Sequence, residues 1–197
     1  METEKTKIHA KIIRNRYVFA ALFAALTAVS IFFTIPLAGG VPIVLRNLFV
    51  VLAGLVLGSF YGGLSALIFL AAGVLGIPVF VIPGGPGAFL TNLGGYLAGY
   101  FIGSLCAGLI CGLPKINEKK NKIFLFVRLC IASFVGFALI LLCGALYMMY
   151  LNSMTLRAAM IAGVVPFIPG DILKFIISIP LALKLRPVAA RYINPDG

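Results

Sequence analysis

The sequence predicts an all-α integral membrane protein with six transmembrane helices and both termini in the cytoplasm. Hydrophobic residues make up 62% of the 197-residue chain and charged residues only 11%, whereas a soluble domain is about half apolar and a quarter charged. The mean hydropathy is +1.14. This composition excludes a soluble enzyme and a disordered chain. Spans of roughly 20 residues would fill the length, so we expect no ATPase module within it.

Six apolar runs define the predicted helices. They cover residues 17–35, 48–57, 64–75, 92–112, 123–150 and 168–185. The first run ends at Pro36, whose ring cannot continue a helix. The second and third runs are short for a span, so we expect them to tilt or to extend into the flanking loops. These bounds divide the chain into a basic tail (1–16), a six-helix membrane domain (17–186) and a second tail (187–197).

Glycine and proline mark the connections. A Gly/Pro-rich connection is expected over residues 36–44 and a tight turn of small residues over 58–63. Residues 77–90 hold three prolines and three glycines, which predicts an ordered non-helical loop. Its Gly84-Gly85-Pro86-Gly87 is not a phosphate loop, because no Gly-Lys-Ser/Thr follows. We interpret the segment from Pro78 to Thr91 as a lid or pocket wall, with a plain surface turn as the alternative.

Basic residues gather in three clusters that flank apolar runs. Twelve of the 16 Lys and Arg residues belong to them: Lys5, Lys7, Lys11, Arg14 and Arg16; Lys115, Lys119, Lys120 and Lys122; and Lys184, Arg186 and Arg191. With six spans all three clusters lie on one side, which the positive-inside rule makes the cytoplasm. The net charge of +11 is therefore mainly an orientation signal, and it carries no evidence for nucleic-acid binding.

The sequence offers no catalytic or metal-binding constellation. The single histidine, His9, lies in the polar N-terminal tail, and the apolar runs hold no pair of carboxylates. The four cysteines lie within apolar runs without a Cys-x-x-Cys pair, so we interpret them as small core residues. We therefore expect a protein that is not an enzyme and that binds no metal or cofactor.

Asp171 and Lys174 are charged residues at membrane depth, in Pro166-Phe-Ile-Pro-Gly-Asp-Ile-Leu-Lys174. Their spacing of three places both side chains on one helix face, where they can pair. An isolated charge at the bilayer centre costs about 2.5 to 3.5 kcal/mol, so the pair should face the bundle interior or a watery cavity. Two interpretations remain: a polar anchor for a solute entering from outside, or a local salt bridge favoured by the helix dipole.

Arg46 is the second charged outlier, at the outer end of the second predicted helix. It is either an interfacial anchor that snorkels to the lipid headgroups, or a fork that binds a carboxylate or joins the Asp171 network.

Small residues recur every four positions on two helices. Gly95, Gly99, Gly103 and Ala107 form one stripe, and Ala20, Ala24 and Ala28 form the other, with Ala21 and Ala25 alongside. Such stripes let helices approach closely. We expect the first stripe to pack inside the bundle. The alanine stripe indicates either packing within the chain or docking on a partner protein.

Three segments together resemble the BioY family, the biotin-binding S components of energy-coupling-factor (ECF) vitamin transporters. They are Pro166-Phe-Ile-Pro-Gly-Asp-Ile-Leu-Lys174, Gly76-Ile-Pro-Val-Phe80 and Gly94-Gly-Tyr-Leu97, in that family's order and spacing. The Pro-Gly-Asp-x-x-Lys element is the most specific, and the resemblance covers essentially the whole chain.

The resemblance implies a six-helix S-component fold in the bacterial cell membrane, with a solute site near the outer face. It implies that Asp171 and Lys174 contact biotin and that Gly94, Gly95 and Tyr96 shape the pocket. Gly85, in the segment interpreted above as a lid or pocket wall, is a further candidate for substrate binding. It also implies that Ala20, Ala24 and Ala28 dock on a transmembrane coupling subunit, to which two ATP-hydrolysing subunits attach.

Two departures from the family pattern fall in segments expected at the outer pocket. This chain has Val44-Leu45-Arg46 where members usually carry Thr-Leu-Gln, and Thr91-Asn92-Leu93 where they usually carry Gly-Pro-Thr. Arg46 adds a carboxylate-binding fork, whereas the lost hydroxyls remove hydrogen bonds suited to a ureido ring. Lipoate, with a similar acid tail and a sulfur ring, is the alternative ligand. Biotin stays first, because Asn92 can serve a ureido group. A structural membrane protein without a ligand is a further alternative.

Overall fold

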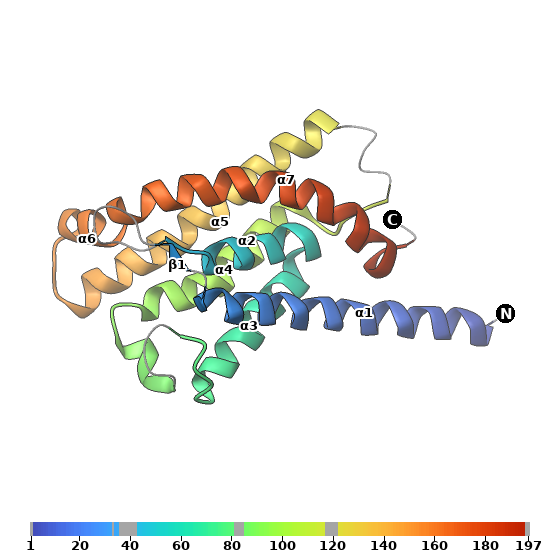
Figure 1. The fold of residues 1–197 in the computed structure, drawn as a ribbon, viewed down its shortest axis with the longest axis horizontal. Helices are drawn as coiled ribbons and strands as arrows, with labels where there is room; N and C mark the ends of the chain where they lie inside the picture. Colours follow the sequence, from blue (N-terminus) through green and yellow to red (C-terminus); the bar gives the residue numbers. More distant parts are fainter. Residues whose placement is uncertain (1, 33, 36–42, 81–84, 117–121, 196–197) are drawn as a thin grey trace.

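The computed structural model describes residues 2–32, 34–35, 43–80, 85–116 and 122–195 and shows a bundle of helices (Figure 1). Its long helices are α1 (Glu2–Val29), α2 (Arg46–Leu57), α3 (Ser59–Val74), α4 (Gly94–Cys111), α5 (Lys122–Leu151) and α7 (Ile168–Ile193). Its short elements are η1 (Ser30–Phe32), β1 (Thr34–Ile35), β2 (Ile43–Val44), η2 (Pro86–Leu90), α6 (Leu156–Gly163) and η4 (Val165–Phe167). The predictions of an all-helical fold and of six principal helices are confirmed.

Four stretches are long and apolar enough to span a membrane in the described part of the chain. They are Thr6–Phe32, Gly94–Cys111, Lys122–Leu151 and Leu156–Ile193. The two remaining long helices, α2 and α3, have 12 and 16 residues, shorter than the roughly 20 residues that a span requires. Helix α3 begins at Ser59, five residues before the predicted run, so the expected extension into a flanking segment is observed there. Six transmembrane helices were predicted, and four stretches of the described residues qualify as spans by length and composition.

The predicted turn over residues 58–63 is wrong. Only Gly58, with a φ of +80°, separates the two helices, and α3 already begins at Ser59. Gly62 serves helix packing instead, because a Cβ placed on it would lie 2.6 Å from the Cα of Gly54. Small residues that looked like a turn therefore permit the close approach of α2 and α3.

Other boundaries differ from the expectations at the ends of the long helices. The basic tail is helical from Glu2 onward, and α7 continues to Ile193. Helix α6 and the antiparallel β1–β2 pair were not expected. The loop over residues 77–90 ends in the 3-10 helix η2, so its last five residues are not irregular. Gly84 of that loop and residues 36–42 lie outside the described residues.

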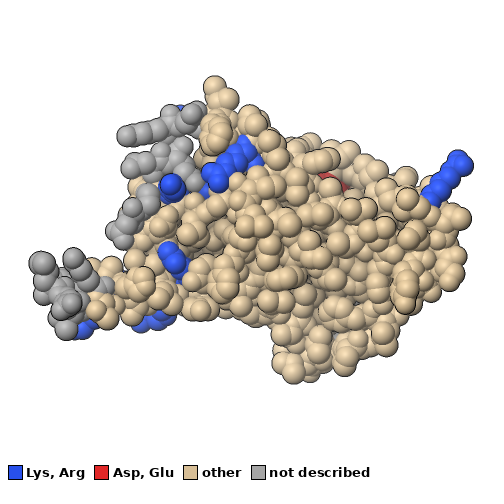
Figure 2. Space-filling view, turned by 180° about the vertical axis from the view of Figure 1, so that it is seen from behind, with Lys and Arg blue, Asp and Glu red and all other residues tan. Residues whose placement is uncertain are grey.

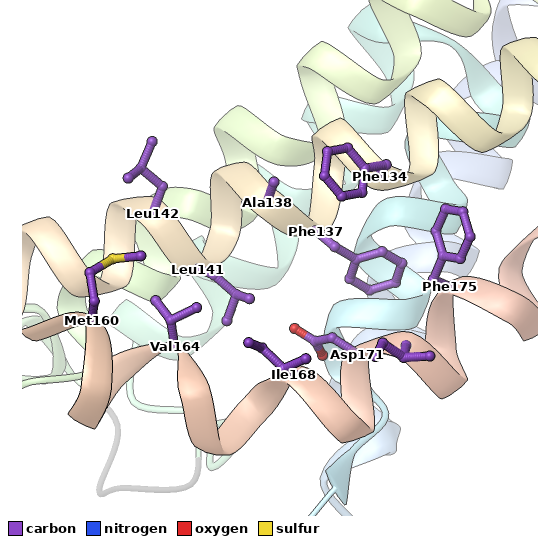
Figure 3. A pocket seen from close by; sticks show the side chains of 11 residues that line it. Phe134, Phe137, Ala138, Leu141, Leu142, Met160, Val164, Ile168, Asp171 and Phe175 are labelled. Atoms are coloured by element: carbon purple, nitrogen blue, oxygen red, sulfur yellow. The ribbon is translucent and has the colours of Figure 1, made fainter.

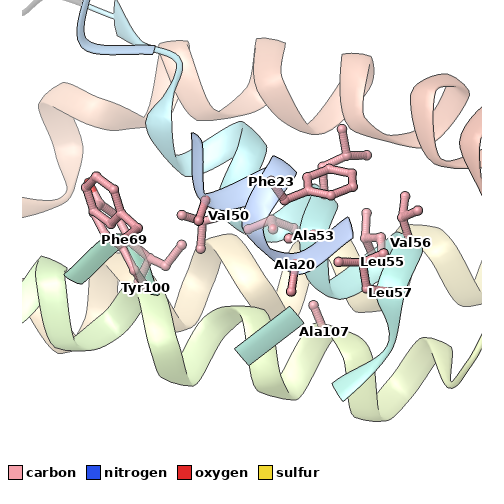
Figure 4. Close-up of a cluster of buried hydrophobic side chains, with 14 of the residues drawn as sticks. Ala20, Phe23, Val50, Ala53, Leu55, Val56, Leu57, Phe69, Tyr100 and Ala107 are labelled. Atoms are coloured by element: carbon pink, nitrogen blue, oxygen red, sulfur yellow. The ribbon is translucent and has the colours of Figure 1, made fainter. Parts of the chain in front are cut away.

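Helix α2 lies at the centre of the bundle, and ten of its twelve residues are buried. A helix that is apolar all round needs partners on every side, and α1, α3, α4, α5 and α7 all contact it. Figure 4 shows Val50, Ala53 and Leu55 of α2 among buried side chains of its neighbours, including Phe23. These apolar side chains therefore pack closely against those of the neighbouring helices and hold α2 at the centre.

The glycine stripe of α4 packs against α5, as predicted. A Cβ on Gly95 would lie 2.5 Å from the carbonyl oxygen of Cys143, and one on Gly103 would lie 2.7 Å from that of Gly136. On Gly99 it would lie 3.0 Å from the Cα of Ile140. The stripe therefore removes the side chains that would keep the two helices apart.

Both termini and the start of α5 lie at one end of the bundle, whereas α6 and the β1–β2 pair lie at the other (Figure 1). Basic side chains gather at the end with the termini (Figure 2). This placement fits an even number of membrane crossings. Hereafter the two ends are called the terminal end and the α6 end.

Arg186, counted above as part of the C-terminal orientation cluster, is fully buried, which the count of charges did not predict. Its guanidinium donates hydrogen bonds to the carbonyl oxygens of Leu55, Cys111, Gly112 and Leu113. These carbonyls lie at the C-terminal ends of α2 and α4, where a helix dipole favours a cation. Arg186 thus joins three helices at the terminal end.

Candidate functional site

Asp171 and Lys174 form a buried ion pair in the first turns of α7. The Nζ of Lys174 lies 2.7 Å from Oδ1 of Asp171, and the residues are only 4% and 6% exposed. Pro169 and Asp171 in the first turn suit a helix start, where proline loses no hydrogen bond and a carboxylate meets the dipole. The predicted pairing is confirmed. The other carboxylate oxygen, Oδ2, is buried without a hydrogen-bond partner among the described residues.

Arg46 begins α2 and is 3% exposed, which rules out the interpretation as a snorkelling anchor. Its Nη2 donates a 2.9 Å hydrogen bond to the carbonyl oxygen of Val79, and its guanidinium carbon lies 5.3 Å from the centre of the Phe69 ring. Its Nε has no hydrogen-bond partner among the described residues. Arg46 therefore retains one free donor in the interior.

Tyr100 of α4 brings these groups together, and the sequence analysis missed it. The residue is 7% exposed and interacts electrostatically with both Arg46 and Asp171. Its ring centre lies 6.2 Å from that of Phe69. We call Arg46, Tyr100, Asp171 and Lys174 the polar cluster. It joins α2, α4 and α7 toward the α6 end of the bundle.

Tyr96 lies one helical turn before Tyr100 and has a structural contact of its own. Its hydroxyl donates a 2.5 Å hydrogen bond to the carbonyl oxygen of Gly163, at the end of α6. Its ring packs against Phe167, with ring centres 5.8 Å apart, and against Gly144, where a Cβ would lie 2.2 Å away. Tyr96 thus holds the chain segment that leads into Asp171.

The remaining site residues from the sequence analysis lie around the η2 segment rather than in the polar cluster. A Cβ on Gly94 would lie 2.1 Å from the carbonyl oxygen of Phe89, and Gly95 packs on α5. Asn92 is exposed and accepts a 2.8 Å hydrogen bond from Nδ2 of Asn152. Gly85, with a φ of +105°, donates its N–H to the carbonyl oxygen of Gly73 at 2.8 Å.

A groove of about 430 Å³ lies between α5, α6 and α7 (Figure 3). Its lining is apolar apart from one carboxylate: Phe134, Phe137, Ala138, Leu141, Leu142, Met160, Val164, Ile168, Asp171, Ile172 and Phe175. Figure 3 shows the Asp171 side chain pointing into the groove from α7. At the rim, Phe134 is 65% and Ile172 55% exposed. The apolar lining residues gave no signal in the sequence, because they resemble any other residues of an apolar run.

Asp171 therefore stands between two environments, the polar cluster on one side and the apolar groove on the other. Its Oδ2 needs a donor and the Nε of Arg46 needs an acceptor, because an unpaired buried polar atom costs free energy. A ligand with an apolar body and both kinds of hydrogen-bonding group complements this arrangement. No group of three or more metal-ligating side chains occurs in the described part of the chain.

Two alanines of the α1 stripe lie inside the bundle. Ala20 is fully buried, Ala24 is 4% exposed, and Ala28 is half-buried. The other face of the helix is exposed and includes Ala21 and Ala25. Packing within the chain, one of the two interpretations of the alanine stripe, is therefore observed for Ala20 and Ala24.

Comparison with known proteins gives a consistent result. The BioY family profile matches residues 3–191. "Biotin transporter BioY" of Thermotoga maritima is 32% identical over 169 residues, which cover 85% of this chain and 93% of the relative. "Probable biotin transporter BioY" of Pyrococcus horikoshii is 37% identical, with coverage of 84% and 93%. A crystal structure of the S-component for biotin from an ECF-type ABC transporter matches with a TM-score of 0.70, 28% identity and 94% coverage of both chains. The chain belongs to the BioY family.

Proposed function

We propose that this chain is the substrate-binding S component of an ECF-type transporter and that it binds biotin between the polar cluster and the apolar groove. The names of its relatives support this function. The observation that carries it is Asp171, which lines the apolar groove and whose carboxylate is held by Lys174 at one oxygen, while the other oxygen is buried and lacks a donor among the described residues.

The chemistry of biotin matches both sides of Asp171. The ureido ring has two N–H donors and one carbonyl acceptor, so Oδ2 of Asp171 accepts from an N–H and Lys174 donates to the carbonyl oxygen. The thioether ring is apolar and packs on Phe137 and Phe175, because sulfur makes favourable contacts with aromatic rings. The acid tail extends toward Arg46, whose free Nε donates to the carboxylate.

The protein works in the plasma membrane with both termini in the cytoplasm. Basic side chains at the terminal end support this orientation, because positive charge is retained on the cytoplasmic side. The polar cluster then lies toward the outer face, where a solute arrives. The chain is not an enzyme, so uptake requires the transmembrane coupling subunit and the two ATP-hydrolysing subunits of the ECF transporter.

Docking on the coupling subunit uses α1. Ala20 and Ala24 are buried, so they act by placing α1 closely against its own bundle. The exposed face of the same helix, with Val18, Ala21 and Ala25, is available to a partner. Small side chains on that face permit a close helix–helix contact in the membrane.

Lipoate is the second candidate ligand, and Asn92 is the observation that favours it. This residue was expected to serve the ureido ring, yet it is exposed and bonded to Asn152. A site that offers no side-chain amide to a ureido ring suits a ligand that has a less polar ring and a similar acid tail.

Calorimetric titration of the purified full-length chain with biotin and with lipoate tests both candidates. We expect tight binding of biotin and at least 100-fold weaker binding of lipoate. Tight lipoate binding without heat from biotin would replace the ligand and retain the site. If neither ligand binds, the proposed function is wrong, and a structural role without a ligand takes its place.

A further inference from the structure

Two side chains, one in the last turns of α5 and one just after its end, fasten the η2 segment to the bundle. The hydroxyl of Tyr147 donates a 2.6 Å hydrogen bond to the carbonyl oxygen of Phe89, within η2. Nδ2 of Asn152 donates a 2.8 Å hydrogen bond to Oδ1 of Asn92, just after η2. Besides the bonds inside η2 itself, the other hydrogen bonds of segment 86–92 are short-range. The N–H of Thr91 and its hydroxyl donate to the carbonyl oxygen of Ala88, the N–H of Ala88 donates to Gly85, and the N–H groups of Leu93 and Gly94 donate to Thr91. We call the Tyr147 and Asn152 contacts the α5 latch.

A row of aromatic rings leads from the latch to the polar cluster. The rings of Phe89 and Phe80 have centres 6.5 Å apart, and those of Phe80 and Phe69 lie 5.6 Å apart, both edge to face. Phe69 in turn lies under the guanidinium of Arg46. The row therefore connects a hydrogen bond at the end of α5 to a charged side chain of the polar cluster.

Arg46 depends on the same region through its backbone contact. Its Nη2 donates to Val79, the residue next to Phe80, and Phe80 fills the space that Gly73 leaves, where a Cβ would lie 2.1 Å from the ring. If Phe80 moved away with the η2 segment, Arg46 would lose the Val79 carbonyl and its contact with Phe69. The position of Arg46 is thus set by contacts beyond α2.

The polar cluster is closed in this arrangement. Arg46, Lys174 and Tyr100 are 3%, 4% and 7% exposed, so a ligand reaches Arg46 only after side chains or backbone move aside. The η2 segment is held from outside by the α5 latch and from inside by packed aromatic rings. Loss of one latch hydrogen bond lowers the free energy needed to open the segment.

We propose that Tyr147 and Asn152 are positioning residues that hold the η2 segment and, through Phe89, Phe80 and Phe69, place Arg46, so that release of the latch sets the rate of ligand exchange. This inference takes its ligand, biotin, from the proposed function, whereas the latch contacts themselves do not depend on which ligand binds. Tyr147 and Asn152 do not belong to the polar cluster or line the groove.

The variant Tyr147→Phe tests the latch, because it keeps the ring and removes only the hydroxyl. Asn152→Ala removes the second contact. Tyr150→Phe is the matched control: it makes the same chemical change one turn along α5, on a side chain that is 81% exposed. Two measurements apply to all three full-length variants: amide hydrogen exchange of residues 85–93 without ligand, and association and dissociation rates of radiolabelled biotin.

We expect faster amide exchange in Tyr147→Phe and Asn152→Ala, and association and dissociation rates that both rise by about twofold to tenfold, the effect of one net hydrogen bond. A residue with a merely structural role would weaken binding without accelerating association. Tyr150→Phe should match the parent chain in both measurements.

Each other outcome has a definite meaning. Unchanged amide exchange in both variants would show that the latch does not hold the segment, and the inference fails. Faster amide exchange with unchanged association and dissociation rates of biotin would also overturn it. The ligand would then enter by another path, such as the apolar groove between α5, α6 and α7. Faster exchange in a chain that never binds biotin would refute the proposed ligand while leaving the latch in place.

Discussion

Arg186 and Leu55, separated by 131 residues in the chain, meet in the interior at the terminal end of the bundle, where the guanidinium donates a hydrogen bond to the Leu55 carbonyl. The same side chain donates to the carbonyl oxygen of Cys111, the last residue of α4, and to that of Leu113 just beyond it. One cation thus compensates the negative ends of two helices that the surrounding apolar residues shield from water. Two other arginines act similarly: Arg128 donates to Ile110 at 2.6 Å and Arg16 to Ile193 at 2.7 Å.

Replacing Arg186 should therefore destabilise the whole bundle. We expect Arg186→Ala to lower the free energy of unfolding by at least about 3 kcal/mol, because several buried carbonyls lose a charged donor together. Arg186→Lys should recover only part of this loss, since an ammonium group lacks the planar fork. Chemical unfolding in detergent, followed by circular dichroism, measures the difference. The free energy of unfolding of Lys184→Ala, at an exposed position in the same helix, should stay within about 0.5 kcal/mol of that of the parent. Equal losses in the two alanine variants would show that the hydrogen bonds of Arg186 do not stabilise the bundle.

The ion pair of the polar cluster allows stability and binding to be separated. Asp171→Asn should abolish measurable biotin binding and also destabilise the chain by about 3 to 5 kcal/mol, because Lys174 is left buried and unpaired. The double variant Asp171→Asn/Lys174→Met removes that unpaired charge, so its stability should return toward that of the parent while binding stays absent. Calorimetry and unfolding measurements on the same preparations give both quantities. Recovery of biotin binding in the double variant would show that the carboxylate does not contact the ligand.

Gly95 and Gly87 provide a matched pair for helix packing at the site. A Cβ on Gly95 would lie 2.3 Å from the Cβ of Tyr147, whereas nothing lies within 4 Å of one on Gly87. We expect Gly95→Ala to separate α4 from α5 and to cost about 1 to 3 kcal/mol. Gly95→Ala should also accelerate biotin dissociation, because the added methyl group displaces Tyr147, whose hydroxyl donates one of the two latch hydrogen bonds. Gly87→Ala should be nearly neutral in unfolding measurements; a similar loss at both positions would refute the packing argument.

Local spacing predicted the Asp171–Lys174 pair, because two charges three residues apart on a membrane helix have few other ways to be satisfied. It also predicted that the glycine stripe packs inside the bundle, although only the structure shows that α5 is its partner. Tyr100 was missed, because a tyrosine within an apolar run has no pattern that distinguishes a site residue from a core residue. The burial of Arg186 was not predicted, because counting charges near helix ends takes no account of carbonyl groups at the ends of α2 and α4 that only the fold brings near. The shortness of α2 was visible in the sequence, whereas its central position among five helices was not.

The two faces of α1 should respond differently to a large side chain, and this difference tests the docking proposal. Ala25 is exposed, so Ala25→Trp should leave biotin binding by the isolated chain unchanged and reduce uptake by cells that contain the coupling and ATPase subunits at least tenfold, by preventing close helix contact. Ala24 is 4% exposed, so Ala24→Trp should instead destabilise the isolated chain itself, because an indole ring does not fit the packed interior. Normal uptake with Ala25→Trp would exclude this face from docking. Normal stability together with lost uptake in Ala24→Trp would show that α1 leaves its own bundle when it binds the partner, because only then does the buried alanine reach the coupling subunit.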